Sequence, residues 1–155
     1  MEDVQGKQDH RGISIQRVGV SQIRLPVKIE TKNGSFQSVL ATIRMTVDLP
    51  HEFKGTHMSR FLEVMHPWSD RTLSSRGVSE ILKEMRERLE AETAHFEMDF
   101  EYFIEKEAPV SKMKGLLGIH CRFEGTLSPK GEDFILSVAV PVTSLCPCSK
   151  EISDY

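Results

Sequence analysis

The sequence predicts an α+β fold in which an antiparallel β-sheet carries two helices on one of its faces. Three observations predict it. Apolar and polar residues alternate, with the period of a half-buried strand, in segments on both sides of a central region. In that central region the apolar period becomes that of an amphipathic helix. Turn sequences containing glycine separate neighbouring strands, as in hairpins. An antiparallel sheet with both helices on one face buries all of these apolar surfaces economically.

The first two strands should form a hairpin. Residues 20–29 carry apolar side chains at alternate positions, and residues 39–49 repeat this alternation more regularly. Between them lies Asn33-Gly34, a dipeptide that tolerates the positive φ angles of tight hairpin turns. We therefore expect these two segments to pair.

Two helices should follow the hairpin. The first begins behind Thr56 as its N-cap and ends before Pro67. Its apolar residues, at helical spacing, are Met58, Phe61, Leu62 and Met65. The second helix has an apolar stripe opposite a charged face. That stripe consists of Val78, Ile81, Leu82, Met85 and Leu89. Both stripes should pack on the sheet.

Strand periodicity then returns in residues 96–102, 117–123 and 134–140, the last segment after a turn at Pro129-Lys130-Gly131. By this period Cys121 falls on the buried side of its strand, where a cysteine behaves as a small apolar residue. The predicted element order is therefore two strands, two helices and two or three strands.

Composition sets the limits on domains and partners. The chain has 155 residues, 39% hydrophobic and 28% charged, which suits one globular domain. We expect residues 1–12 to be a mobile tail, 13–145 one folded unit, and 146–155 a segment that carries two cysteines. A net charge of -3 favours neither nucleic acid nor an anionic membrane as partner. The sequence has no signal peptide and no apolar run near the roughly 18 residues of a membrane span. We expect a cytoplasmic protein.

The strongest chemical signal is Cys146-Pro147-Cys148, directly after the last strand. Thiolates are good ligands for zinc or iron, and a bound metal keeps a thiol deprotonated near neutral pH. The proline fixes the bend between the two thiols. By spacing alone, the pair fits a metal or catalytic site, a redox pair, or two thiols in an ordinary turn equally well. It is not a zinc finger, because no second ligand pair lies at finger spacing.

A second candidate lies at the start of the first helix, where free amides and the helix dipole favour an anion. His57 and Arg60 lie three residues apart, on the face turned away from the apolar stripe. A phosphate or carboxylate of a ligand would fit there. The alternative is an ordinary helix start in which Arg60 pairs with Glu63 or Glu52.

Three segments together resemble a known family. They are Lys54 to Phe61, Ala108-Pro109-Val110-Ser111, and Val142 to Ser153 with its Ser-Leu-Cys-Pro-Cys-Ser-Lys core. These segments resemble GTP cyclohydrolase type IB, a bacterial folate-pathway enzyme, and the resemblance covers nearly the whole chain. It implies a tunnelling fold (T-fold) unit of order ββααββ. It also implies a homotetramer with active sites at subunit interfaces.

The resemblance implies that GTP is the substrate and that a divalent metal (zinc, manganese or iron) is the cofactor. In the reaction that the resemblance implies, water activated by the metal would attack the guanine ring, which would open, release formate and reclose to 7,8-dihydroneopterin triphosphate, the first step of tetrahydrofolate biosynthesis. On this basis Cys146 is the expected metal ligand and catalytic residue, with Cys148 beside it as the alternative. His57, Arg60 and Lys150 are the expected substrate-binding residues.

Family members continue beyond the equivalent of Tyr155 into a second T-fold unit, which supplies a histidine and glutamates to the site. We therefore expect the 155 residues alone to lack part of the active site. Two other interpretations remain. One is a structural or oligomerising fragment of the enzyme. The other is a T-fold nitrile reductase, which would use a cysteine nucleophile and NADPH without a metal.

Overall fold

The computed structural model describes residues 13–51, 55–142, 144 and 146–151, apart from the side chains of Ser149 and Lys150. The expected mobile tail, residues 1–12, lies outside the described residues. Within the described ranges, six strands form one sheet in the order β3-β1-β2-β4-β5-β6. The strands are β1 (Ile15–Glu30), β2 (Phe36–Leu49), β3 (Thr72–Leu73), β4 (Ala94–Glu107), β5 (Lys114–Ser128) and β6 (Gly131–Ala139). The helices are α1 (Met58–Met65), the 3-10 helix η1 (His66–Ser69), α2 (Ser75–Leu89) and α3 (Pro147–Glu151).

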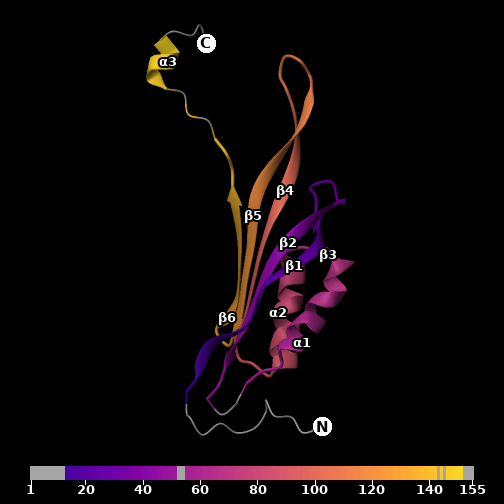
Figure 1. Ribbon diagram of the computed structural model, residues 1–155, viewed down its shortest axis with the longest axis vertical. Coiled ribbons are helices and arrows are strands. Elements are labelled where there is room, and N and C mark those ends of the chain that lie inside the picture. Colours follow the sequence, from indigo (N-terminus) through magenta and orange to yellow (C-terminus); the bar gives the residue numbers. More distant parts are fainter. Residues whose placement is uncertain (1–12, 52–54, 143, 145, 152–155) are drawn as a thin grey trace.

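The sheet is antiparallel except for β3, whose two residues pair with β1 in parallel. Both long helices, α1 and α2, cover the same face of this sheet (Figure 1). The predicted α+β class, the placement of the helices and the order of two strands, two helices and three strands are therefore confirmed, whereas β3, η1 and α3 were not predicted. The hairpin turn between β1 and β2 is also as predicted, and Gly34 adopts the positive φ of 76° that the turn requires.

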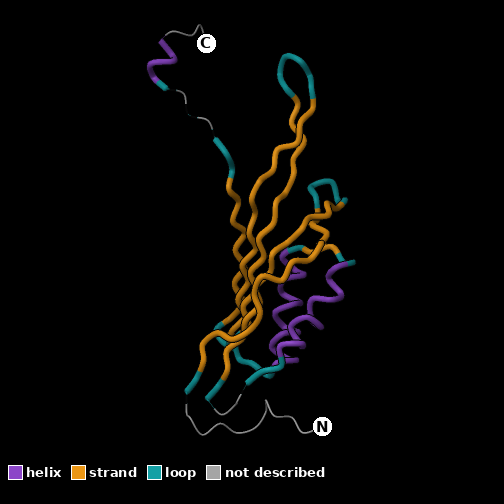
Figure 2. Tube along the Cα trace, in the orientation of Figure 1, coloured by secondary structure: helices purple, strands orange, loops and turns teal. Residues whose placement is uncertain are grey.

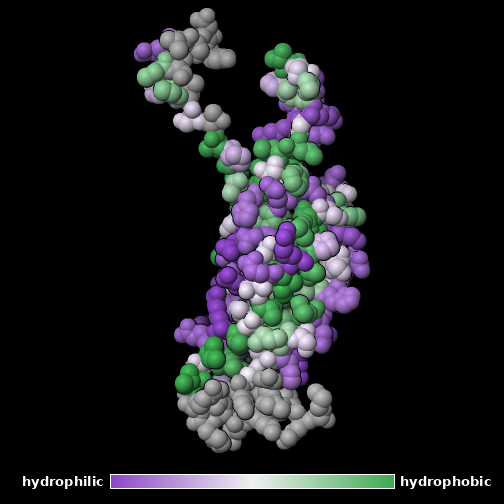
Figure 3. All heavy atoms as spheres, viewed as in Figure 1, coloured by the Kyte–Doolittle hydropathy of each residue, from purple (hydrophilic) through white to green (hydrophobic). Residues whose placement is uncertain are grey.

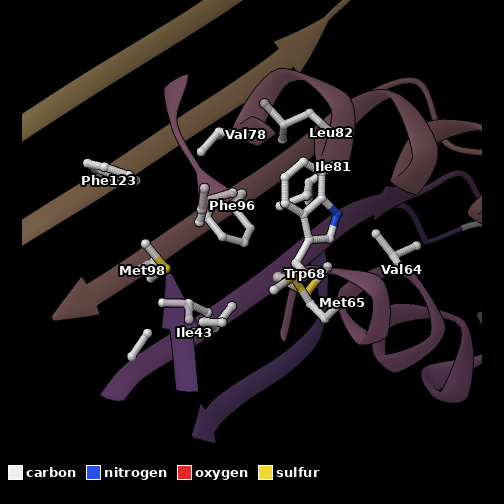
Figure 4. Packing of buried hydrophobic residues seen from close by; sticks show 14 of the residues in the cluster. Ile43, Val64, Met65, Trp68, Val78, Ile81, Leu82, Phe96, Met98 and Phe123 are labelled. Carbon is white, nitrogen blue, oxygen red and sulfur yellow. The ribbon is translucent and has the colours of Figure 1, made fainter. Parts of the chain in front are cut away.

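The core lies between the helices and the strands β1, β2, β4 and β5. Figure 4 shows Trp68 from η1 and Ile81 and Leu82 from α2 facing the strand residues Phe96 and Ile43. All five side chains are at most 2% exposed. The stripe of α2 is buried at every predicted position. Cys121 is 7% exposed, so its predicted place in the core is confirmed.

The first helix differs from its prediction. Its N-cap is His57, not Thr56, and its buried residues are Phe61, Val64 and Met65. The predicted apolar positions Met58 and Leu62 are 41% and 51% exposed. The helix continues into η1, which buries Trp68. The buried stripe is therefore rotated toward Val64, because the core side of this short helix is set by its connection to η1.

The strands are longer than their apolar alternation suggests. β1 begins at Ile15 and contains register shifts between Ile15 and Val18 and between Val20 and Ile23. These irregularities break the alternation at its start, which hides the strand from a period-based search. His95 lies within β4 and pairs with Thr46 and Thr126.

Two parts of the chain project from the sheet. The hairpin of β4 and β5 extends beyond β1 and β2, and the segment after β6 leads away to α3 (Figures 1 and 2). Hydrophobic atoms gather at the tip of the projecting hairpin (Figure 3). Val110, Met113 and Leu116 are 93%, 71% and 74% exposed there.

Candidate functional site

The cysteine segment lies beyond the end of β6. Cys146 and Cys148 are both exposed, and Pro147 begins the short helix α3, where its fixed φ suits the first helical position. Lys150 lies in the same helix, but its side chain is outside the described part. The structure therefore presents two neighbouring thiols on a segment that stands away from the sheet.

His57 and Arg60 lie at the other candidate position, the start of α1. His57 has an extended backbone, and its carbonyl accepts a 3.2 Å hydrogen bond from the amide of Arg60. The Arg60 guanidinium donates a 2.7 Å hydrogen bond to the carbonyl of Arg88, close to the end of α2. Neither Glu63 nor Glu52 is its partner in a described contact; Glu52 lies outside the described residues, and Glu63 pairs with Arg88 at 3.3 Å.

The structure does not bring these two candidate positions together. In Figure 1, α1 begins at the end of the sheet where β4 and β6 start, whereas α3 lies beyond the opposite end of β6. His57 and Arg60 are thus separated from Cys146 and Cys148 by the length of the sheet within one chain.

The described residues contain no group of three or more His, Cys, Asp or Glu side chains that could hold a metal. Cys146 and Cys148 have the donor chemistry that zinc and iron favour, but two thiolates are fewer than the four ligands of a tetrahedral site. By themselves, these two thiolates are therefore an incomplete ligand set for such a site.

A polar network that sequence reasoning missed covers the face of the sheet away from the helices. The carboxylate of Glu97 on β4 lies 3.5 Å from guanidinium nitrogens of three arginines. They are Arg17 on β1, Arg44 on β2 and Arg122 on β5. Asp99 lies 3.2 Å from Arg122 and 3.3 Å from His120.

These charges largely balance within the network, so it joins four strands without leaving an unmatched carboxylate. Alternation places each residue on the outer face, but only the strand register brings them together. The spacing of these residues along the sequence does not predict which of them meet.

Two pKa shifts mark the more enclosed titratable groups. Burial and the nearby Arg17 guanidinium lower the pKa of His95, although Asp48 and Glu97 oppose this shift. Its Nδ1 lies 3.1 Å from the Thr126 hydroxyl. Burial raises the pKa of the Cys121 thiol, which makes it a poor nucleophile compared with an exposed cysteine.

None of the described helices is both long and apolar enough to cross a membrane. This is the structural finding that bears on the expected absence of a membrane partner.

Comparison with known proteins supports the resemblance. Curated proteins named GTP cyclohydrolase FolE2 match over almost the whole chain. The one from Syntrophotalea carbinolica is 51% identical over 99% of this chain and 57% of its own length. Those from Magnetococcus marinus and Nitrosococcus oceani are 50% and 48% identical over 100% of this chain and 58% of their own lengths. The chain therefore spans less than two thirds of the length of these relatives.

A family model described as "Type I GTP cyclohydrolase folE2" matches residues 1–155. The expected subtype, type IB, is not part of that description, whereas the type I cyclohydrolase assignment is. With a match over the full chain and relatives at about half identity, the chain belongs to the type I GTP cyclohydrolase family described as folE2.

Proposed function

We propose that this chain forms part of a GTP cyclohydrolase of type IB, which opens the guanine ring of GTP and yields 7,8-dihydroneopterin triphosphate and formate. The observation that carries the proposal is the family match over residues 1–155, together with relatives of about 50% identity that bear this enzyme's name. The activity is assigned to the protein at the length of those relatives, because this chain spans 57% of one and 58% of another.

Within that enzyme, we assign the metal-binding thiolate to Cys146, with Cys148 as the alternative. Exposure of both thiols, on the segment that follows β6, supports this role, since they are accessible to a metal and to a substrate. A divalent metal bound there would supply an activated water for attack on the purine. The remaining ligands would come from outside the described residues, since these contain no complete ligand set.

We keep His57, Arg60 and Lys150 as candidate substrate-binding residues. Two of them start α1, at the end of the sheet opposite to α3 (Figure 1). If His57 and Cys146 serve one site, they must come from different copies of the chain. This separation supports an active site at a subunit interface.

The same reasoning supports a homo-oligomer, which we propose to be a tetramer of T-fold units. With β3, η1 and α3 set aside, the order is ββααβββ, so the ββααββ order of that fold is present and β6 follows it as a further strand. β6 is an edge strand whose residues are all exposed, and Phe134, Leu136 and Val138 continue the core face, because they pair with Gly125, Phe123 and Cys121 of β5. Phe134 lies 5.4 Å from the buried Phe123, ring centroid to ring centroid. Mass measurement of the native protein by light scattering tests the assembly, and a monomer would contradict it.

The activity is tested by following pterin fluorescence and formate release from GTP, with added zinc or manganese, in the protein at its relatives' length. Cys146→Ala should abolish turnover, whereas Cys121→Ala, which removes a buried thiol, should retain it. Absence of formate release by the wild type would overturn the proposed function. Full activity of Cys146→Ala would reject the site assignment alone.

Metal binding has a readout that does not depend on activity. Zinc should protect Cys146 and Cys148 from alkylation and should bind at least tenfold more weakly to Cys146→Ala, because thiolate ligands dominate zinc affinity. Equal alkylation with and without zinc would remove the metal from the proposal.

A further inference from the structure

The central sheet divides into two ribbons along part of its length. β2 and β4 pair only from Thr42 with Asp99 to Val47 with Ala94. Beyond that level, β2 still pairs with β1 as far as Phe36, and β4 still pairs with β5 as far as Glu107. Residues 36–41 and 100–107 therefore face each other without backbone pairing. Figure 2 shows the β1–β2 and β4–β5 ribbons ending in separate turns.

One side chain crosses the opening between the ribbons. The carboxamide nitrogen of Gln37 donates a hydrogen bond of 3.0 Å to the carbonyl of Phe103. The carboxamide oxygen accepts a hydrogen bond of 2.8 Å from the amide of the same residue. In an antiparallel ladder, two paired residues exchange both of these bonds through their backbones. Here the Gln37 side chain takes the place of the missing backbone partner.

The backbone of Gln37 is already used, since it pairs with Ile29 of β1. Its side chain is therefore the group that reaches β4. The space beside it is an open cavity of about 750 Å³, lined by Phe36, Tyr102, Ile104 and neighbouring turn residues. Among the described residues, the hydrogen bonds of Gln37 are the ones that join the two ribbons above the level of Thr42.

Besides these hydrogen bonds, the ribbon beyond Phe103 is attached at its base, where Ile104 and Leu117 pack against the core. We call residues 104–117 the arm. Its strands are held to each other by backbone pairing and by two ion pairs, Glu105 with Lys114 at 2.8 Å and Glu107 with Lys112 at 3.3 Å. Both ion pairs lie within the arm, so they do not fix its direction. Beyond Ile104 and Leu117 the side chains of the arm are largely exposed. A two-stranded ribbon without a packed face has little stability of its own, and its direction depends on how its base is attached.

We propose that Gln37 is a releasable clamp that sets the angle of the arm against the β1–β2 hairpin. While both hydrogen bonds are present, the arm continues the line of the sheet. When they break, the arm hinges at its base, where Ile104 and Leu117 are the last residues packed against the core, so the buried residues Ala41 and Phe100 keep their places. The clamp can open without unfolding of the sheet, since it involves one side chain of β2 and none of the backbone hydrogen bonds between paired strands.

Two measurements test the clamp. The first is hydrogen exchange of the Phe103 amide, with Met98 as an internal reference in the paired part of β4. Gln37→Met keeps the side-chain length but removes both hydrogen bonds. It should speed exchange at Phe103 at least tenfold and leave Met98 unchanged. Gln16→Met, at an exposed position of β1, is the matched control and should change neither amide.

Gln37→Glu separates the two hydrogen bonds, because a carboxylate still accepts from the Phe103 amide but no longer donates to its carbonyl. Exchange at Phe103 should therefore be slower in Gln37→Glu than in Gln37→Met. Equal rates in these two variants would overturn the proposal. So would a wild-type rate in Gln37→Met.

The second measurement is the distance between spin labels on Ser35→Cys and Ser111→Cys, at the turns of the two ribbons, with Cys146 and Cys148 replaced by serine. A single narrow distance distribution is expected with Gln37. A broader or shifted one is expected with Gln37→Met. An unchanged distribution in Gln37→Met, with the Met98 reference intact, would show that Gln37 does not control the arm.

Discussion

The guanidinium of Arg60 donates a 2.7 Å hydrogen bond to the backbone carbonyl of Arg88, and so ties the start of α1 to the last turn of α2. Carbonyls in the last turn of a helix lack partners within the helix, and a positive charge there also suits the helix dipole. Arg60, which the sequence suggested as an anion-binding residue, therefore has a structural role in this chain.

Replacing Arg60 with methionine should lower the free energy of unfolding by about 1 kcal/mol, the usual net value of one such hydrogen bond. Urea unfolding followed by circular dichroism measures this. Arg76→Met, on the exposed first turn of α2, is the control and should change stability little. If Arg60→Met has the stability of the wild type but a raised KM for GTP, the guanidinium binds substrate and the structural role is wrong.

Glu97→Gln should lower the free energy of unfolding by more than the removal of a shorter but exposed ion pair does. The Glu97 side chain is 16% exposed and is shared by three guanidiniums, so its loss leaves them clustered without their common carboxylate. We expect a loss of about 1–3 kcal/mol, since breaking a partly buried pair exceeds the value of an exposed one.

The comparison variant is Glu80→Gln, which removes a 2.7 Å pair with Arg71 whose side chains are 53% and 48% exposed. This loss should be about 0–1 kcal/mol and should shrink in high salt. If both variants lose the same free energy of unfolding, then neither the burial of Glu97 nor its sharing by three arginines strengthens its ion pairs.

Gly77→Ala should destabilise the protein although alanine favours helices. A Cβ at Gly77 would lie 2.6 Å from the Trp68 ring and 2.9 Å from Leu73 Cδ1. Overpacking of a rigid ring costs about 1–3 kcal/mol, which exceeds the roughly 1 kcal/mol that alanine gains in a helix. Gly115→Ala, where nothing lies within 4 Å of the added carbon, is the control and should be near neutral. Thermal unfolding distinguishes them; an equally stable Gly77→Ala would show that Trp68 can move.

His95 should make stability depend on pH. Its pKa is lowered in the folded protein by burial and by Arg17, so below a pH of about 6.5 the unfolded chain binds the proton more readily. Stability that is present above this pH is therefore lost as the pH falls toward 5. In His95→Gln this part of the loss should disappear. Urea midpoints at pH 7 and pH 5 measure it, and an unchanged pH slope in the variant would contradict the assignment.

The three thiols should react in two classes. Cys146 and Cys148 are exposed, whereas Cys121 is buried and has a raised pKa. In the reduced, metal-free protein, Ellman's reagent at pH 8 should modify two thiols quickly and the third only after denaturation. Mass spectrometry identifies the slow residue. Rapid modification of Cys121 in the native protein would show that β5 opens readily.

Local patterns in the sequence determined the elements and their buried faces. Alternation in residues 39–49 identified β2, and the stripe of Val78 to Leu89 identified the core side of α2. These predictions succeeded because the period of side chains along one segment is a local property of that segment. The same local reasoning placed Cys121 in the core, and the cysteine segment was recognisable by its resemblance to a family.

Only the tertiary structure decided which residues from different segments meet. Glu97 lies among arginines of three other strands, and Gln37 reaches Phe103, because of strand register and of the level at which β2 and β4 separate. The buried side of α1 was mispredicted for a similar reason, since Trp68 and the following chain fix its rotation. A period indicates which face a residue occupies, but the partner on that face depends on contacts between distant parts of the chain.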